Sequence, residues 1–277
     1  MKSLPILASI SLFLVPGAIA LNLPMPVWAE VAQNIAPLSH SNHSVHQVAR
    51  SITVRVLVQD NRGSGTMIAH DGGVYTVLTN AHVLTAGAPY RIETPDGRVY
   101  PAEEVLASRV IGLDAALLQF RSDQSYPVAK LADATTMAVG QPVWAAGFPE
   151  ETGDFLMSSG SLSLLPPQAL AEGYQLGYTN EVFPGMSGGP LLNEAGEAIG
   201  INGLTAYPIL NDSYVFMDGS QPSAAQREEM RRLSWAVPVP VALGQGGRGA
   251  GEQGSRGAKP GREPPQPPLI KGGRWRR

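Results

Sequence analysis

A serine that could act as a nucleophile stands in a glycine-rich stretch, where residues 183–191 read Phe-Pro-Gly-Met-Ser-Gly-Gly-Pro-Leu. A serine hydroxyl is a weak nucleophile, so Ser187 would need a base to take its proton and backbone N–H groups to hold an oxyanion. Neighbouring glycines let the backbone curl so that such N–H groups point to one place. The stretch could also be only a tight turn, and residues elsewhere decide between these alternatives.

A histidine and an aspartate that could activate this serine precede it in the chain. Residues 77–84 read Val-Leu-Thr-Asn-Ala-His-Val-Leu, a β-type run that reaches His82. Residues 111–118 read Ile-Gly-Leu-Asp-Ala-Ala-Leu-Leu, in which Asp114 opens an apolar strand. Alone, the histidine could begin a helix and the aspartate could form a turn. The order His, Asp, Ser recurs in catalytic triads, so the three together indicate nucleophilic catalysis by Ser187.

The sequences around these three residues resemble those of a known enzyme family. Asn-Ala-His at 80–82, Gly-Leu-Asp-Ala-Ala-Leu at 112–117 and Gly-Met-Ser-Gly-Gly-Pro at 185–190 are similar to the motifs of the trypsin-like serine proteases. The most similar in style are the disulfide-free bacterial members, including the high-temperature-requirement group. The resemblance covers about residues 45–243. It implies an all-β fold of two antiparallel six-stranded β-barrels, with the active site in the cleft between them.

The resemblance also implies a role for each residue. His82 would serve as general base and then as general acid, and Asp114 would fix its tautomer and stabilise its charge. Ser187 would form an acyl-enzyme during hydrolysis of a peptide bond. The backbone N–H groups of Gly185 and Ser187 would form the oxyanion hole. This reaction implies polypeptide substrates, no cofactor and no metal.

Position 186 departs from a pattern that many digestive members of the family share. They carry an aspartate there, which pairs with the new N-terminus after a propeptide is cleaved. Met186 cannot make this ion pair. We therefore expect that the protein does not use this activation switch.

The substrate pocket is predicted less firmly than the catalytic residues. Its candidate residues are Glu181, Val182, Phe183, Gly203 and Thr205. A buried Glu181 would favour Lys or Arg before the cleaved bond. Alternatively Glu181 lies in a solvated loop, and apolar groups such as Val182 and Phe183 form the wall. Extended backbone at residues 201–205 would pair with the substrate strand.

The elements that must position these residues are predicted to be short strands. Residues 51–58 alternate with period two and are rich in β-branched residues, and a turn sequence follows at 60–63. Similar runs occupy residues 66–69, 74–79, 91–94, 99–107, 142–147, 158–165, 174–178, 191–192, 198–202 and 235–239. This spacing predicts a sandwich or a barrel, between which the resemblance selects the barrel. An insertion at 206–234 either overhangs the pocket or is a surface excursion.

The N-terminal residues and the composition predict an exported bacterial protein, periplasmic or secreted. Residues 1–29 have the charged start and apolar core of a signal peptide, with cleavage after Ala29 or after Ala20. An uncleaved membrane anchor is the alternative; otherwise the membrane is contacted only through this segment. The chain has no cysteine, so core packing rather than disulfides must stabilise it.

The remaining segments complete the predicted organisation. Residues 30–45 are expected to be a linker, 46–243 a trypsin-like protease domain, and 244–277 a disordered tail rich in Gly, Pro and Arg. The tail carries more basic than acidic residues, but the whole chain has a formal net charge of only −3, and we expect no nucleic-acid partner. We expect the tail to leave no room for a downstream peptide-binding module of the kind that high-temperature-requirement proteases carry, which argues against their caged oligomers. The sequence does not determine the oligomeric state, but we favour a monomer.

Two alternatives to an exported serine endopeptidase come from other functional classes. The first is a protease-fold binding protein that is catalytically weak or inactive. The second is an esterase-type hydrolase, because the same triad cleaves esters. The second is disfavoured because the sequence lacks the Gly-x-Ser-x-Gly elbow and the alternation of strands and helices of α/β-hydrolases.

Overall fold

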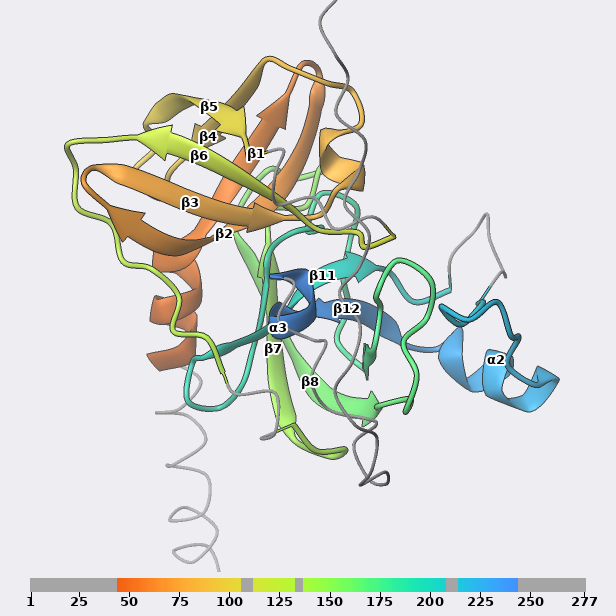
Figure 1. Cartoon of the computed structure of the whole chain (residues 1–277). Coiled ribbons are helices and arrows are strands. Elements are labelled where there is room, and N and C mark those ends of the chain that lie inside the picture. The colour runs from red at the N-terminus through yellow and green to blue at the C-terminus, as the bar shows by residue number, and fades with distance from the viewer. Residues whose placement is uncertain (1–43, 106–111, 133–136, 208–213, 244–277) are drawn as a thin grey trace, which may run out of the picture.

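The strands form two closed six-stranded antiparallel barrels (Figure 1). The structure is a computed structural model that describes residues 44–105, 112–132, 137–207 and 214–243. The predicted signal peptide, the predicted tail and nearly all of the predicted linker lie outside these residues. The all-β, two-barrel fold predicted from the sequence is confirmed.

Each barrel uses six strands that are consecutive in the chain. The first contains β1 (Thr53–Val58), β2 (Asn61–Asp71), β3 (Val74–Thr79), β4 (Tyr90–Glu93), β5 (Val99–Glu104) and β6 (Ala116–Arg121), in the spatial order β1-β2-β3-β6-β5-β4. The second contains β7 (Pro142–Gly147), β8 (Leu156–Leu164), β9 (Leu176–Tyr178), β10 (Pro190–Leu192), β11 (Ala198–Leu204) and β12 (Ser234–Pro238), in the order β10-β11-β12-β9-β8-β7. Most predicted strands are present, with shifted ends.

Alternating apolar residues explain why these strands close into barrels. In β1 the side chains of Val54, Val56 and Val58 are fully buried in the core of the first barrel. In β7 alternate residues serve different cores. Val143 faces the interior of the second barrel, whereas Trp144 belongs to a cluster that contains residues of both barrels. This shared cluster holds the barrels against each other.

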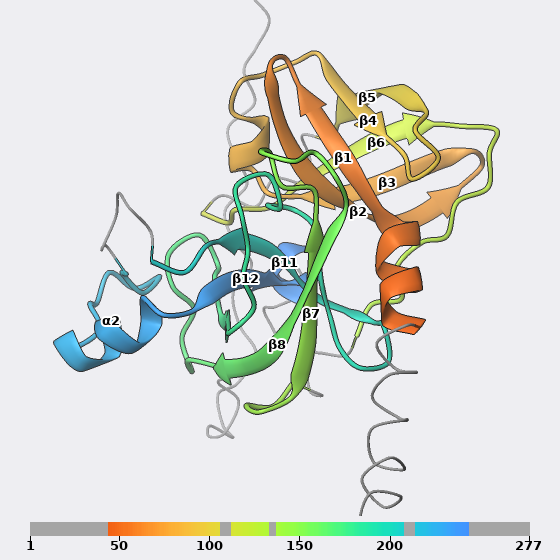
Figure 2. The ribbon, with the colours of Figure 1, turned by 180° about the vertical axis from the view of Figure 1, so that it is seen from behind.

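The N-terminal end of the domain differs from the prediction. Residues 51 and 52 belong to a helix of residues 44–52 rather than to a strand (Figure 2). Val45, Ala49 and Ile52 lie on one face of this helix and are buried in the shared cluster. Burial of this face decides the conformation where the local alternation suggested a strand.

Three short helices complete the described part of the chain. They are η1 (His82–Leu84), α2 (Ala224–Met230) and α3 (Val239–Ala242). The predicted insertion contains α2, which begins with a capping box at Ser223 and projects from the second barrel in Figure 1 and Figure 2. None of the helices in the described ranges is long and apolar enough to cross a membrane.

Candidate active site

The pairing of β3 with β6 brings His82 and Asp114 together. Thr79 at the end of β3 pairs with Ala116 at the start of β6, so the residues just beyond these ends are neighbours. His82 Nδ1 lies 2.6 Å from Asp114 Oδ2, and His82 N donates to Asp114 Oδ1 at 2.9 Å. The carboxylate therefore fixes both the backbone and the ring of the histidine.

Burial and charge act in opposite directions on this pair. Burial disfavours the charged carboxylate, but hydrogen bonding and charge from His82, with a hydrogen bond from Tyr174, hold the pKa of Asp114 below its ordinary value. Burial also opposes the charged imidazole. The hydrogen bond and charge of Asp114, with the charge of Glu172, nevertheless raise the pKa of His82 above 6.5. An ionised Asp114 keeps the ring proton on Nδ1, which leaves Nε2 free to act as a base.

The serine stretch forms two successive turns. Met186 N donates to Phe183 O at 3.0 Å, and Gly189 N donates to Met186 O at 3.0 Å. The third residue of each turn has a positive φ, 92° at Gly185 and 85° at Gly188. These are features of type II turns, whose third residue is normally glycine. The glycines are thus required for the local fold, and the serine occupies the second position of the second turn.

The two turns of residues 183–189, called the serine turn below, pack closely on the first barrel. A Cβ atom at Gly188 would lie 2.2 Å from Ser64 O in β2 and 3.0 Å from Thr79 Cα at the end of β3. Ser64 N also donates to Ser187 O at 2.8 Å. The turn is therefore held against the two strands that lead to His82.

The hydroxyl of Ser64 links this turn to the second barrel. It donates to Gly185 O at 2.8 Å and accepts from Phe148 N at 2.8 Å. Gly63 beside it allows η1 to pack on β2, because a Cβ atom there would lie 2.6 Å from Val83. Ser64 was not predicted as a site residue. The local signal for it is the Gly-Ser-Gly string at 63–65, since glycines mark close approach of backbone segments.

Two backbone N–H groups in the serine turn are unused. Those of Gly185 and Ser187 have no acceptor among the residues that the structure describes. Ser187 Oγ donates to Gly203 O at 3.3 Å, and within the same residues it has no hydrogen bond to His82. The structure thus joins the histidine to Asp114, and it holds the serine against the strands that lead to this pair.

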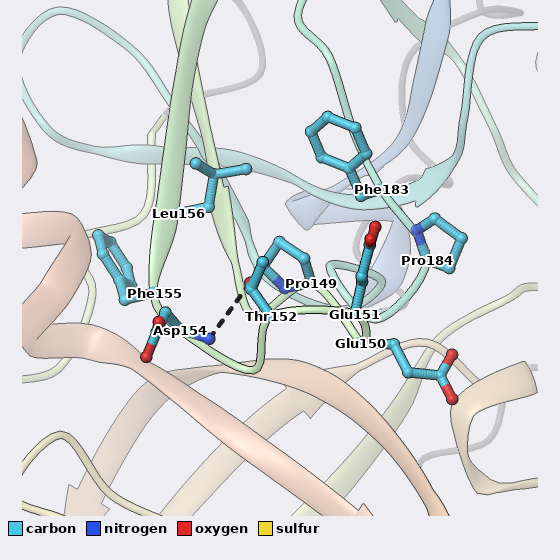
Figure 3. A pocket seen from close by; sticks show the side chains of 9 residues that line it. All are labelled: Pro149, Glu150, Glu151, Thr152, Asp154, Phe155, Leu156, Phe183 and Pro184. Carbon is cyan, nitrogen blue, oxygen red and sulfur yellow. Dashed lines mark hydrogen bonds between the residues drawn. The ribbon is translucent and has the colours of Figure 1, made fainter.

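A cavity of about 720 Å³ opens beside the serine turn (Figure 3). Phe183 and Pro184 line one side of it, and the loop between β7 and β8 lines the other. The lining residues from the loop and the start of β8 are Pro149, Glu150, Glu151, Thr152, Asp154, Phe155 and Leu156. Glu150 N donates to Pro184 O at 2.8 Å and so joins the two sides. Across the described ranges, no group of three or more metal-binding side chains could hold a metal ion.

The predicted pocket residues lie in different environments. The side chain of Glu181 is exposed, whereas Val182 is buried in the core of the second barrel. Phe183 is 43% exposed and lines the cavity. Gly203 is buried in β11 and presents its carbonyl to the serine hydroxyl, and Thr205 follows this strand, partly buried. Of these residues, Phe183 begins the first of the two turns, and Gly203 is bonded to the serine hydroxyl.

Met186 replaces a potential ion pair with apolar packing. Its side chain is fully buried in the core of the second barrel. Its sulfur accepts a hydrogen bond from Phe183 N at 3.4 Å. A Cβ atom on Gly147 would lie 2.8 Å from Met186 Cβ, so β7 and the serine turn are in direct contact here. The described residues of this core cluster are apolar, so the environment suits a thioether rather than a carboxylate.

Curated proteins with similar sequences include bacterial and vertebrate serine proteases. The "Probable periplasmic serine endoprotease DegP-like" of Marinomonas sp. is 35% identical over 142 residues, which are 50% of this chain and 29% of that protein. The "Periplasmic serine endoprotease DegP" of Escherichia coli K12 is 34% identical over 143 residues, 50% of this chain and 29% of that protein. The chain thus spans less than a third of the length of either relative.

A solved structure and a protein family also match. The structure described as "HtrA-type protease AlgW with tripeptide" superposes with a TM-score of 0.55 at 22% identity, covering 72% of this chain and 60% of that one, and supports the fold. Residues 63–201 match the family described as "Trypsin-like peptidase domain". This match covers half of the chain and includes His82, Asp114 and Ser187. The chain therefore belongs to the family of trypsin-like peptidases.

Proposed function

We propose that this protein is a serine endopeptidase in which His82, Asp114 and Ser187 form the catalytic triad. The observation that carries the proposal is the buried carboxylate of Asp114, bonded to both His82 Nδ1 and His82 N. This arrangement leaves His82 Nε2 as the only ring nitrogen able to take a proton. The serine turn lies on the strands that lead to this histidine.

The proposed reaction begins when the Ser187 hydroxyl exchanges its bond to Gly203 O for one to His82 Nε2. Such catalytic hydrogen bonds often tighten only when substrate binds. Ser187 Oγ then attacks the substrate carbonyl carbon as its proton passes to Nε2. His82 returns this proton to the leaving amine, which gives an acyl-enzyme that water hydrolyses by the same steps.

The unused N–H groups of Gly185 and Ser187 support an oxyanion hole in the serine turn. Both groups lack protein acceptors among the described residues, so a negatively charged oxygen would meet donors that need not break other bonds. The hydrogen bond from Ser64 Oγ to Gly185 O fixes the turn that presents them. Loss of one such donor typically lowers the rate by about 100–1,000-fold.

The positions of Glu181 and Phe183 support an uncharged substrate pocket. Because the Glu181 side chain is exposed, it is poorly placed to select a cationic residue before the cleaved bond. Phe183 lies next to the serine turn and offers an apolar surface. We therefore expect cleavage after uncharged residues, and little change in this preference in Glu181→Ala.

Export is part of the proposal. Two of the similar proteins are named as periplasmic, and residues 1–29 have the pattern of a signal peptide. The protease domain would span residues 46–243, together with residues 44 and 45 because Val45 is buried in the core. Cell fractionation and N-terminal sequencing of the mature protein would test export and distinguish cleavage after Ala29 from cleavage after Ala20.

Digestion of a peptide library by the wild-type protein and by Ser187→Ala tests the activity. We expect internal cleavage by the wild type and none by the variant, with both proteins giving the same circular dichroism spectrum. Equal cleavage by both would assign the activity to a contaminant or to another residue. No cleavage by the folded wild type would favour the alternative, a binding protein with a protease fold.

A further inference from the structure

The carboxylate of Asp114 receives a third hydrogen bond from the second barrel. The phenol of Tyr174 donates to Asp114 Oδ2, the same oxygen that faces His82 Nδ1. Tyr174 lies in the connection between β8 and β9, so this bond links the triad residues of the first barrel to the second. Its side chain is 1% exposed, and burial beside the charge of Asp114 raises the pKa of the phenol well above 10. Tyr174 therefore remains a neutral donor.

The position of the phenol is fixed by the turn that precedes β9. Leu170 N donates to Tyr174 O at 2.8 Å, and Gly173 N donates to Leu170 O at 3.1 Å. Glu172 O accepts from Asp114 N at 2.8 Å, so the same turn binds the backbone of the aspartate. Asp114 is thus bound to this turn by two separate hydrogen bonds, one between its backbone N and Glu172 O and one between its side chain and the phenol of Tyr174.

Gly203 leaves the space that the phenol occupies. A Cβ atom at Gly203 would lie 2.4 Å from both Cε1 and the hydroxyl oxygen of Tyr174. The carbonyl of Gly203 accepts from Ser187 Oγ. The absence of a side chain at residue 203 therefore leaves room for the phenol next to the residue whose carbonyl accepts from Ser187.

With these bonds every polar atom of Asp114 has a partner. Its N donates to Glu172 O, its backbone O accepts from Asn80 Nδ2 at 2.8 Å, and Oδ1 accepts from His82 N. Oδ2 is shared between His82 Nδ1 and Tyr174. A buried carboxylate with both oxygens hydrogen-bonded to fixed donors is held in one orientation, which here is the orientation that holds the imidazole.

We propose that Tyr174 is a positioning residue of the active site, which holds Asp114 Oδ2 toward His82 and limits how strongly the carboxylate attracts the imidazole proton. The inference rests on the proposed function of the triad. Without the phenol the carboxylate would rotate more freely and its charge would act on the imidazole alone. Glu172, the other charged group that acts on His82, would remain in place.

Tyr174→Phe tests this role because it removes the hydroxyl and keeps the ring. We expect kcat to fall about tenfold or more, since a hydrogen bond to a charged group is lost, with KM little changed. We also expect the pKa of His82, measured by NMR titration, to rise, because a carboxylate without the phenol's hydrogen bond directs more of its charge to the imidazole and stabilises the protonated ring. The acid limb of the kcat/KM profile would move to higher pH by the same amount.

Tyr178→Phe is the matched control. Tyr178 is also fully buried and close in the chain, but its hydroxyl donates to Asn202 Oδ1 at 2.9 Å rather than to the triad. We expect a similar loss of thermal stability and no shift in the titration of His82. Equal titration curves for wild type, Tyr174→Phe and Tyr178→Phe would overturn the proposal, whatever the stability of the variants.

Gly203→Ala should disturb the same hydrogen bond between Tyr174 and Asp114, and it is the alternative test if Tyr174→Phe does not fold. Its methyl group overlaps the phenol, so displacement of Tyr174 should again raise the pKa of His82. An unchanged pKa would contradict the proposal. Because the titration needs no substrate, it decides the role of Tyr174 even if the wild type proves inactive, an outcome that would instead reject the proposed peptidase function.

Discussion

At the scale of single residues, Asp114 determines what His82 can do. A histidine with 47% of its side chain exposed would ordinarily lose its proton near its usual pKa. Here hydrogen bonding and charge from Asp114 outweigh the opposing effect of burial and raise the pKa of His82. Raising this pKa makes Nε2 a stronger base, and it also increases the fraction of His82 that is protonated and inactive at a given acidic pH.

The pH dependence of kcat/KM follows from this shift. A general base must be neutral, so activity falls as the pH decreases through the pKa of His82. We expect the midpoint of this acid limb above 6.5, the ordinary value. In Asp114→Asn the midpoint should move to lower pH and kcat should fall about 1,000–10,000-fold, because the amide no longer selects the tautomer with a free Nε2. A midpoint that is the same in both proteins would show that Asp114 does not act on the base.

At the scale of elements, two short turns between β9 and β10 hold Ser187 against the first barrel. Each turn requires a positive φ at its third residue, and each such residue is a glycine, Gly185 or Gly188. The second glycine also lies against the backbone of the first barrel. The turn therefore depends on glycine for two independent reasons, conformation and space.

Gly188→Ala and Gly219→Ala separate these two requirements. The residues have nearly equal φ, 85° and 86°, but a Cβ atom would meet Ser64 O at 2.2 Å only at Gly188, and nothing within 4 Å at Gly219. We expect Gly219→Ala to cost about 1–2 kcal/mol and to retain activity. Gly188→Ala should cost more and abolish peptide hydrolysis. Thermal unfolding and kcat/KM measure both effects, and similar behaviour of the two variants would contradict the packing argument.

The sequence predicted those parts of the site that are encoded locally. The strands follow from alternation, and the triad from short motifs around His82, Asp114 and Ser187, although the triad itself awaits direct test. Tyr174 and Ser64 were missed because their partners lie 60 and 121 residues away, at Asp114 and Gly185. Contacts of this range arise only when the two barrels close against each other. The Gly-Ser-Gly string at 63–65 marks a close approach of backbone at Ser64 but does not identify its partner, and no local pattern indicates the partner of Tyr174.

At the scale of the whole molecule, one hydrophobic cluster joins the barrels and the N-terminal helix. It contains Leu78 of the first barrel, Trp144 and Ile201 of the second, and Ile52 of the helix of residues 44–52. The triad candidates are divided between the barrels, so this cluster sets their relative position. The strand predicted from residue 51 is wrong at its start for the same reason, since the cluster recruits these residues into the helix.

Truncation distinguishes a structural role of the helix of residues 44–52 from a role of the N-terminus as an activation switch. A chain that begins at residue 44 keeps the helix and should retain full kcat/KM, because the buried Met186 has no ion-pairing group for a new N-terminus. A chain that begins at residue 53 loses three buried side chains and should unfold at least about 5 °C lower. A large loss of activity in the longer chain would show that preceding residues complete the site.

The central claim is that Ser187 is a nucleophile activated by His82. Its most direct test is treatment of the folded protein with a fluorophosphonate, followed by mass spectrometry of the modified peptide. We predict one covalent adduct, on Ser187, which is absent from Ser187→Ala and strongly reduced in His82→Ala. A folded wild-type protein that forms no adduct, or that carries it on another residue, would contradict the account.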